Sequence, residues 1–255
     1  MDNLRHNAEL EKNKLSWQDK PLLRDIYRSF YENIAQLLTH DVAGLTVELG
    51  SGLGKIKDVI PDCLCTDLFP NPWLDRVENA YRLSFSDASV ANLILFDVFH
   101  HLRYPGEAFE EIRRVLVPGG RVIIFDPCVS VLGLIVYGLL HPEPLGLGAP
   151  IAWMAPAGWT PEADGYYAAQ GNAWRLFCRK QERPRWKDWR RVGLRKCSAL
   201  SYVASGGYSR RAWYPRRALP LLRKIDHVCD RLPGLFATRL LVALERTCDP
   251  SNEAS

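Results

Sequence analysis

The sequence lacks an apolar run long enough to cross a membrane as a simple helix. Its longest run, Val129–Leu140, has twelve residues and contains one serine and two glycines, whereas a spanning helix needs about 18–20 apolar residues. The first residues, Met1 to His6, also lack the apolar stretch that is typical of a secretory signal. We therefore expect a protein that is neither secreted nor membrane-spanning.

The seven cysteines lack the spacing of a structural zinc site. Their number is odd and no two CxxC pairs occur, so we expect no metal. Cys63 and Cys65 are one residue apart in an apolar stretch, a setting typical of buried free thiols. Free thiols favour a reducing compartment, and we expect the protein to be cytoplasmic.

The composition is not extreme, but the charge is segregated. With 255 residues, 47% hydrophobic and 24% charged, the chain is neither disordered nor collagen-like, and its length suits one large domain. Residues 173–224 hold 16 Lys or Arg and only two acidic residues, a local charge of +14 within a net charge of +4. This asymmetry indicates an anionic partner: nucleic acid, a phospholipid surface or a phosphorylated substrate. The alternative is a solvated basic face with internal ion pairs.

Alternation of helical and strand patterns predicts an α/β fold with a parallel sheet. After residue 126 the rhythm changes to a long Gly/Pro/Trp-rich connection, which is typical of a lid or binding loop. Residues 1–16 and 249–255 are expected to fray. The expected helices are 20–39, a short one ending near 60, 107–116 and 219–232, and the expected strands are 44–49, 63–67, 91–96, 121–126 and 238–244.

A glycine-rich turn follows the first expected strand, in Val47-Glu-Leu-Gly-Ser-Gly-Leu-Gly54. Such glycines allow a tight turn and a close approach of the backbone to a ligand. A dinucleotide fingerprint needs glycine at position 55 and a P-loop needs Ser or Thr at position 56, where Lys55 and Ile56 stand. The turn therefore favours a ligand that meets Glu48, with Asp67 placed to bind a ribose diol.

Four segments in register resemble the class I S-adenosylmethionine-dependent methyltransferases, in particular the type 11 group. The resemblance extends from Val42 to Asp126 and implies a Rossmann-like fold of seven strands, with S-adenosylmethionine as cofactor. The segments are the glycine turn with Asp67, then Leu83-Ser-Phe-Ser-Asp-Ala-Ser89, Asp97-Val-Phe-His-His-Leu102 and Arg114-Val-Leu-Val-Pro-Gly-Gly120.

This resemblance also implies a cofactor site. Asp67 would bind the ribose hydroxyls, and Asn79, in place of the usual Asp, would accept a hydrogen bond from the adenine amino group. Asp97 belongs to the same site. The residues implied to hold the methionyl end are Glu48, Gly50, Ser51, Gly52 and Gly54.

Histidines are the candidate catalytic residues. Methyl transfer is an in-line displacement, so the enzyme positions the acceptor and removes its proton. His100 and His101 follow a strand at the carboxyl edge, where open α/β sheets bind ligands, and a histidine can act as the base. His141, with Glu143 in the His-Pro-Glu-Pro turn, is the second candidate. Packing beneath the cofactor, helix capping or a rigid turn are the structural alternatives.

Outer motifs resemble a bacterial subgroup often encountered among surface-polysaccharide and glycolipid genes. The resemblance implies O-methylation of a lipid-linked sugar or a similar amphiphile. A soluble metabolite as acceptor and a non-catalytic scaffold in a glycan-assembly complex are the alternatives. The motifs are Lys20-Pro-Leu-Leu-Arg-Asp-Ile-Tyr27, Asp67-Leu-Phe-Pro-Asn-Pro-Trp-Leu-Asp75, Val136-Tyr-Gly-Leu-Leu-His-Pro-Glu-Pro144 and Ser205-Gly-Gly-Tyr-Ser209.

Trp186 and Trp189 alternate with basic residues. This mixture is typical of a membrane interface, so we expect residues 173–224 to bind the anionic inner face of the cytoplasmic membrane. Stacking on single-stranded nucleic acid is another use of such residues. Nucleic acid is not expected here, because the strand before His100 lacks the Asn/Asp-Pro-Pro-Tyr ending of amino-group methylases. Burial of both tryptophans in the core is the third reading.

The expected organisation is an N-terminal helical extension, residues 1–40, followed by a methyltransferase domain, residues 41–248. Within that domain, residues 42–126 form the cofactor-binding core and residues 127–235 a substrate-covering elaboration.

Overall fold

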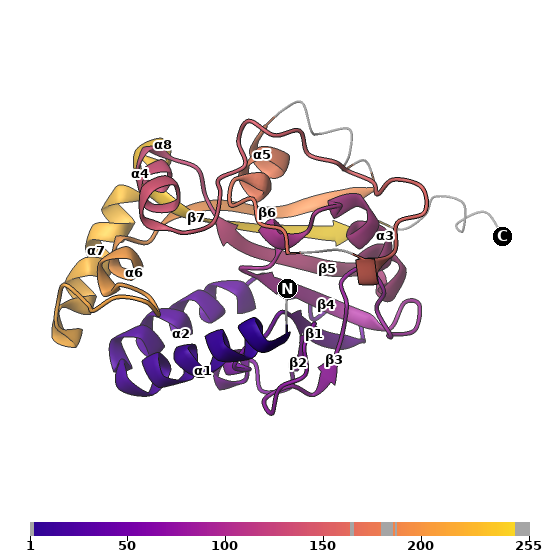
Figure 1. The fold of residues 1–255 in the computed structure, drawn as a ribbon, viewed down its shortest axis with the longest axis horizontal. Helices are drawn as coiled ribbons and strands as arrows, with labels where there is room; N and C mark the ends of the chain where they lie inside the picture. Colours follow the sequence, from indigo (N-terminus) through magenta and orange to yellow (C-terminus); the bar gives the residue numbers. More distant parts are fainter. Residues whose placement is uncertain (1–2, 164–165, 180–185, 187, 248–255) are drawn as a thin grey trace.

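A seven-stranded sheet forms the centre of the computed structural model, which describes residues 3–163, 166–179, 186 and 188–247 (Figure 1). The strand order is β3-β2-β1-β4-β5-β7-β6. Neighbouring strands pair in parallel, except that β7 runs antiparallel to both β5 and β6. The strands are β1 (Leu45–Leu49), β2 (Leu64–Asp67), β3 (Arg76–Val77), β4 (Val90–Phe96), β5 (Leu116–Pro127), β6 (Trp189–Ser198) and β7 (Ala237–Arg246).

Helices cover both faces of the sheet (Figure 1). On one face lie α3 (Pro105–Val115) and α5 (Asn172–Cys178), and on the other lie α1 (Asn3–Asp19) and α2 (Pro21–Ala35). At one end gather α4 (Val131–Ile135), α6 (Leu200–Ser205), α7 (Leu219–Cys229) and α8 (Pro233–Phe236). Short turns are η1 (Lys55–Asp58), η2 (Phe99–His101), the π-helical η3 (Val136–Leu140), η4 (Pro161–Ala163) and η6 (Arg216–Ala218).

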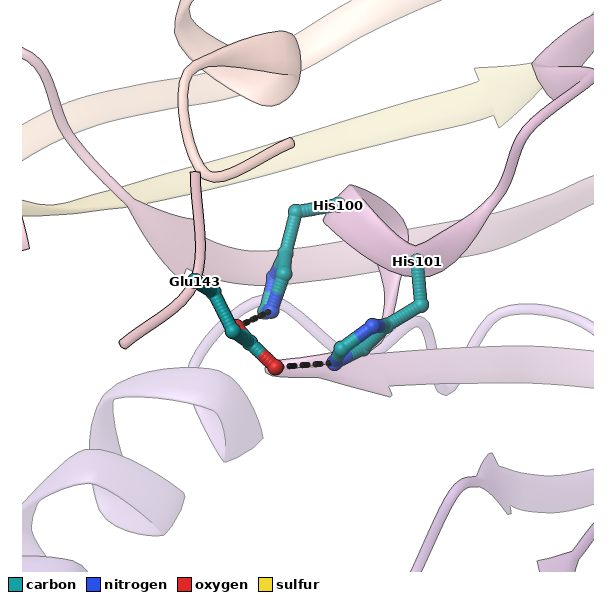
Figure 2. A group of neighbouring side chains, drawn as sticks. All are labelled: His100, His101 and Glu143. Atoms are coloured by element: carbon teal, nitrogen blue, oxygen red, sulfur yellow. Dashed lines mark ion pairs between the residues drawn. The ribbon is translucent and has the colours of Figure 1, made fainter. Parts of the chain in front are cut away.

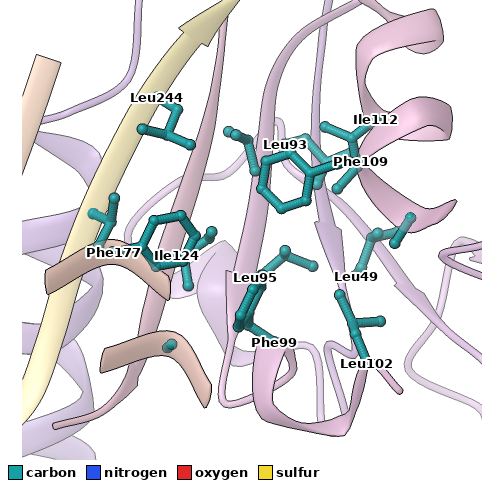
Figure 3. Close-up of a cluster of buried hydrophobic side chains, with 14 of the residues drawn as sticks. Leu49, Leu93, Leu95, Phe99, Leu102, Phe109, Ile112, Ile124, Phe177 and Leu244 are labelled. Atoms are coloured by element: carbon teal, nitrogen blue, oxygen red, sulfur yellow. The ribbon is translucent and has the colours of Figure 1, made fainter. Parts of the chain in front are cut away.

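The core has two layers because successive side chains of a strand point to opposite faces of the sheet. In β4, Leu93 and Leu95 pack on the side of α3, whereas Ile94 and Phe96 pack on the side of α2. Figure 3 shows the first layer, in which Phe109 of α3 lies among the strand residues. All seven residues of β4 are buried, which explains its near-continuous apolar sequence.

The N-terminal segment differs from the sequence expectation. Residues 1–16 were expected to fray, but residues 3–19 form α1. Leu10 and Trp17 anchor this helix in the core layer that also contains α2. Its apolar residues are too few to give a strong helical pattern, so tertiary packing, rather than an amphipathic repeat, explains it. The other terminal segment, 249–255, lies outside the described residues.

Several boundaries also differ. The helix expected to end near residue 60 is only the short turn η1. The expected helix 219–232 ends at Cys229, and α8 follows it. Strand β5 begins at Leu116, earlier than the expected start at residue 121.

The basic segment holds a strand that the sequence did not predict. Residues 189–198 form β6, at the edge of the sheet beside β7. The proposed membrane role of Trp186 and Trp189 is wrong, because both pack against the core and both rings contact Phe109 edge-on. Trp186 also donates its indole N–H to the carbonyl of Leu176. Both rings are partly buried, so the structure agrees best with the third reading, in which the tryptophans pack in the core.

The expectation for the paired cysteines is confirmed. Cys63 and Cys65 are buried free thiols, and burial raises the pKa of both, that of Cys65 to about 11. Among the described residues, no helix combines the length and the apolar character needed to cross a bilayer.

Candidate active site

The glycine-rich turn leaves β1 at the carboxyl edge of the sheet. Gly50 has a φ of +72°, and a side chain there would collide with Val98, so this position requires glycine. Ser51 fixes the turn to β2, because its N–H donates to the carbonyl of Thr66 (2.8 Å) and its Oγ accepts from the Thr66 N–H (3.0 Å). Ser51 therefore shapes the turn through its backbone and side chain.

Gly54 closes the same turn in a left-handed conformation, with a φ of +62°. A Cβ atom there would lie 2.9 Å from the carbonyl oxygen of Trp73. The segment after β2 thus packs directly on the turn.

Glu48 is a buried carboxyl group at the end of β1. Its Oε2 has no hydrogen-bond partner among the described residues. Burial, with a smaller contribution from the nearby Asp67, raises the pKa of Glu48 to about 8, although a hydrogen bond with Ser51 opposes the shift. A buried, unsatisfied carboxyl oxygen is costly, so this group is suited to receive a cationic donor from a ligand.

Asp67 ends β2 opposite the glycine turn. Its Oδ2 accepts from the Gly52 N–H (3.0 Å) and its Oδ1 from the Leu68 N–H (2.7 Å). Burial raises the pKa of Asp67, and His6 and the backbone N–H groups oppose the shift. The carboxylate is therefore held by backbone donors in a fixed orientation.

Helix α1 covers this end of the site, a contribution that sequence reasoning missed. Nε2 of His6 lies 3.9 Å from Oδ1 of Asp67, and the His6 ring contacts Phe69. Leu10 lies over Gly52, since a Cβ atom on that glycine would be 3.6 Å from Leu10 Cδ2. The helix has no motif, so only its position reveals this role.

The side chains of Asn79 and Asp97 both have partners within the protein, which the resemblance did not imply. The Asn79 side-chain oxygen accepts from the Tyr81 N–H at 3.0 Å and closes its own turn. Asp97 has a φ of +54°, which is uncommon for a residue with a side chain, and it forms an ion pair with the buried Arg239. Arg239 is another residue that sequence reasoning missed, because β7 carries no motif.

A cluster of histidines and carboxylates lies at the carboxyl ends of β4 and β5, on the same sheet edge as the glycine-rich turn (Figure 2). The buried His100 donates from Nδ1 to Oδ1 of Asp126 (2.9 Å), and its Nε2 lies 3.5 Å from Oε2 of Glu143. Nδ1 of His101 donates to the Tyr167 carbonyl (2.9 Å), and its Nε2 lies 3.9 Å from Oε1 of Glu143. We name His100, His101, His141 and Glu143 the histidine–glutamate cluster.

His141 belongs to the cluster through the His-Pro-Glu-Pro turn. Its Nδ1 accepts from the Glu143 N–H at 3.3 Å and lies 3.9 Å from Oε2 of the same residue. The structure therefore brings the three predicted histidines together around one carboxylate.

The surroundings of His100 and His101 shift their pKa values in opposite directions. Burial alone would lower the pKa of His100, but Asp126 and Glu143 outweigh it and raise the pKa to about 10. Burial and the neighbouring His100 lower the pKa of His101 to about 4. The pKa of Glu143 is lowered, because hydrogen bonds from His100 and Tyr166 outweigh its desolvation by burial. At neutral pH the cluster therefore combines a charged His100 with a neutral His101.

Glu143 is held by two residues from the long connection. It accepts hydrogen bonds from the Tyr166 hydroxyl and the Gln170 side-chain amide. The Gln170 N–H also donates to the Pro144 carbonyl at 3.0 Å, and the Ala169 N–H donates to the His100 carbonyl at 2.9 Å. Sequence reasoning missed Tyr166 and Gln170, since nothing local marks them.

The sheet order and the single antiparallel β7 are those of the class I methyltransferase fold, with N-terminal helices added. Residues 47–124 match the family described as "Methyltransferase domain". These residues include the glycine turn, Asp67 and the first two histidines of the cluster. Residues 47–124 therefore form an S-adenosylmethionine-dependent methyltransferase domain of class I, with S-adenosylmethionine as the methyl donor.

Solved structures are similar in fold at low sequence identity. A Haloferax volcanii protein described as a methyltransferase, in complex with the Trm112 methyltransferase activator, has 17% identity and a TM-score of 0.52, with 93% of this chain and 98% of that chain covered. Geranyl diphosphate C-methyltransferase from Streptomyces coelicolor has 14% identity and a TM-score of 0.49, with 86% and 78% covered. An Archaeoglobus fulgidus methyltransferase has 11% identity and a TM-score of 0.49, with 88% and 94% covered. No curated protein matches the sequence significantly.

Proposed function

We propose that this methyltransferase transfers the methyl group of S-adenosylmethionine to an oxygen of an amphiphilic acceptor, such as a lipid-linked sugar or glycolipid. It would do so at the anionic inner face of the cytoplasmic membrane. The observation that carries the proposal is an exposed apolar surface that leads along the chain directly into the histidine–glutamate cluster.

The donor side fits S-adenosylmethionine. The unpartnered Oε2 of Glu48 is suited to the ammonium of the methionyl end, and Asp67 to the ribose hydroxyls. Gly50, Ser51, Gly52 and Gly54 form the turn around it, and Asn79 and Asp97 flank it. When bound, the cofactor supplies an electrophilic methyl group, while the chain positions both reactants.

The acceptor side is the histidine–glutamate cluster. It lies at the carboxyl edge, where ligands of open α/β sheets bind. Two histidines follow β4, and His101 is the partly exposed one, with 31% of its side chain accessible to solvent. We propose that an acceptor hydroxyl is oriented against this histidine and Glu143, with His100 and His141 completing the wall, and that its proton leaves toward the cluster.

Exposed apolar side chains lie on α4 and η3, just before His141. Leu139 is 78% exposed, and α4 packs against α8, which carries the exposed Leu235. Figure 1 shows α4, α7 and α8 gathered at one end of the molecule. We call this surface the apolar end face; it comprises Val131, Leu134, Ile135, Leu139, Leu140, Leu221, Ile225, Val228, Leu232 and Leu235, all exposed.

Basic residues accompany the apolar end face, which favours an anionic lipid surface over a neutral partner. The guanidinium of Arg210 donates to the carbonyl of Leu140 (3.5 Å), and the neighbouring Trp213 is 78% exposed. Lys224 on α7, Arg231 between α7 and α8, and Arg211 are also exposed. Each Lys or Arg near an anionic surface contributes about 1 kcal/mol, so a few of them, with inserted leucines, give measurable binding.

Liposome flotation tests the surface. The protein should float with anionic vesicles at low salt, and salt should release part of it, because exposed charges are screened beyond about 8 Å at physiological ionic strength. The double variant Leu139→Ser/Leu140→Ser should lose the vesicle binding that persists at high salt, because that part depends on inserted apolar side chains. Leu15→Ser on α1, at a residue 60% exposed, is the matched control and should float like the wild type.

Acceptor screening tests the chemistry. Methyl-labelled cofactor with a membrane extract should label a lipid-extractable product. A protein that never floats and labels only water-soluble material would instead support a soluble-metabolite methyltransferase. Binding of the cofactor without methyl transfer to any component of the extract would support the alternative of a non-catalytic scaffold.

A further inference from the structure

We propose that His100, His101 and Glu143 form a binding site for one divalent transition-metal ion. Nε2 of His100 and Nε2 of His101 lie 3.5 and 3.9 Å from the two oxygens of Glu143. One donor atom from each of the three residues lies within 4.8 Å of the others. Ligand atoms about 2.0–2.1 Å from a tetrahedral zinc ion are about 3.4 Å apart, so small side-chain movements reach ligation geometry. The Nε2 proton of His100 is lost to solvent when the ion binds, because a ligating histidine must be neutral.

The ring nitrogens that face away from Glu143 have the partners that metal-ligating histidines use. Nδ1 of His100 donates to the Asp126 carboxylate and Nδ1 of His101 to the Tyr167 carbonyl, both at 2.9 Å. A carbonyl only accepts, so Nδ1 of His101 carries the proton and Nε2 of the neutral ring offers a lone pair. Such outer partners fix the tautomer and orient the ring toward a metal.

Glu143 has outer partners as well. The Tyr166 hydroxyl donates to Oε1 and the Gln170 amide to Oε2, and ligating carboxylates are typically hydrogen-bonded in this way. Each oxygen keeps a further lone pair for a cation. Figure 2 shows that the side chains converge, with both imidazole rings directed at the carboxylate.

A buried ion pair explains only part of this arrangement. His100 lies between Asp126 and Glu143, which is a sufficient reason for its own position. His101 is different, because 3.9 Å between Nε2 and Oε1 of Glu143 is too long for a hydrogen bond. A metal ion bound between the two rings and the carboxylate would be the partner of Nε2 of His101.

The ligand set indicates the class of metal. Two imidazoles and one carboxylate suit Zn²⁺, Fe²⁺, Mn²⁺ or Co²⁺, whereas Mg²⁺ prefers oxygen ligands. Our sequence expectation of no metal came from cysteine spacing, which does not address this cluster.

The existence of the site is independent of the acceptor, whereas its use in catalysis rests on the proposed function. A cation there could bind an acceptor hydroxyl and favour loss of its proton, as metal ions do for bound water. A test of metal binding alone therefore separates the two proposals.

The experiment uses the full chain, treated with a chelator and then titrated by calorimetry with Zn²⁺ alone, and with Co²⁺ to read the ligand field by visible absorption. We expect one ion per chain, with a dissociation constant in the micromolar range or below, and no saturation by Mg²⁺ at the same concentrations. His101→Ala and Glu143→Gln should each weaken Zn²⁺ binding at least tenfold. Asp126→Asn should weaken it about 10–100-fold through the orientation of His100.

His227→Ala is the matched control, because the His227 side chain is 83% exposed on α7, and it should bind Zn²⁺ like the wild type. If His101→Ala fails to fold, His101→Gln takes its place, with circular dichroism as the check. Absence of stoichiometric Zn²⁺ on the folded wild type, or unchanged binding in both ligand variants, would overturn the site. Methyl transfer that persists after chelation would leave the proposed function standing while the site loses its catalytic use.

Discussion

The donor half and the acceptor half of the site meet at one sheet edge but hold their polar groups in different ways. In the donor half, partners lie close in the sequence: Gly52 donates to Asp67 and Ser51 to Thr66, fifteen residues apart. In the acceptor half, Glu143 contacts His100 from 43 positions away and Gln170 from 27. Backbone from adjacent strands fixes the first half, and side chains of a long connection fix the second.

This difference indicates where each half can vary. A turn held by backbone hydrogen bonds keeps its shape under most side-chain changes, so it suits a constant ligand such as the methyl donor. Loops vary readily on a rigid scaffold, so the part of the cluster that the long connection supplies, around Glu143, can be adapted to an acceptor. The predictions below test whether changes in one half leave the other intact.

The largest effect is expected from the acceptor half. His101→Ala should lower turnover on the order of 10²–10⁴-fold, the usual contribution of a positioned proton-transfer group. Donor affinity should stay at the wild-type value, because His101 contacts Glu143 and the Tyr167 carbonyl and none of the donor residues. Single-turnover kinetics and calorimetry with the cofactor measure the two quantities. A parallel loss of donor affinity would contradict the separation of the halves.

A smaller effect is expected from the donor half. Asp67→Ala removes a charged hydrogen-bonding group, a loss of about 1.5–3 kcal/mol and thus at least tenfold in cofactor affinity. Asp87→Ala, at a 78% exposed side chain, is the control. Calorimetry showing wild-type cofactor affinity in folded Asp67→Ala would remove the ribose assignment. Zinc titration of the same variant should match the wild type.

The smallest effect is a pH dependence from Glu48. Its folded pKa of about 8 exceeds the ordinary 4.5, so between these values the folded chain holds a proton that the unfolded chain has lost. The free energy of unfolding should therefore fall as pH rises through this window. Thermal melts from pH 5 to 8 should show this slope, and Glu48→Gln should flatten it.

Cofactor binding should also depend on pH, because it changes the protonation of Glu48. A donor ammonium beside Glu48 favours the ionised carboxylate, so binding below pH 8 should release a proton and strengthen with pH. Calorimetry in buffers of different ionisation enthalpy measures that release. An equal release from Glu48→Gln would place the proton elsewhere.

The donor half could be predicted from the sequence because its signals are local. Glycines with positive φ at Gly50 and Gly54, acidic residues at strand ends and an apolar β4 each follow from a few neighbouring residues. The parallel part of the sheet follows from the alternation of strands with helices. Short-range patterns therefore determined the fold class and the place of the glycine-rich turn.

The acceptor half needed the tertiary structure. The histidines were visible in the sequence, but their convergence on Glu143 depends on how residues 141–163 and 166–170 pack beside the turn that follows β4. The tryptophans of the basic segment show the opposite error, since local composition indicated a membrane surface and packing against Phe109 decided otherwise. Helix α1 likewise reaches Asp67 only through packing on α2. Contacts between distant residues carry no local periodicity, so only the folded chain reveals which groups share a site.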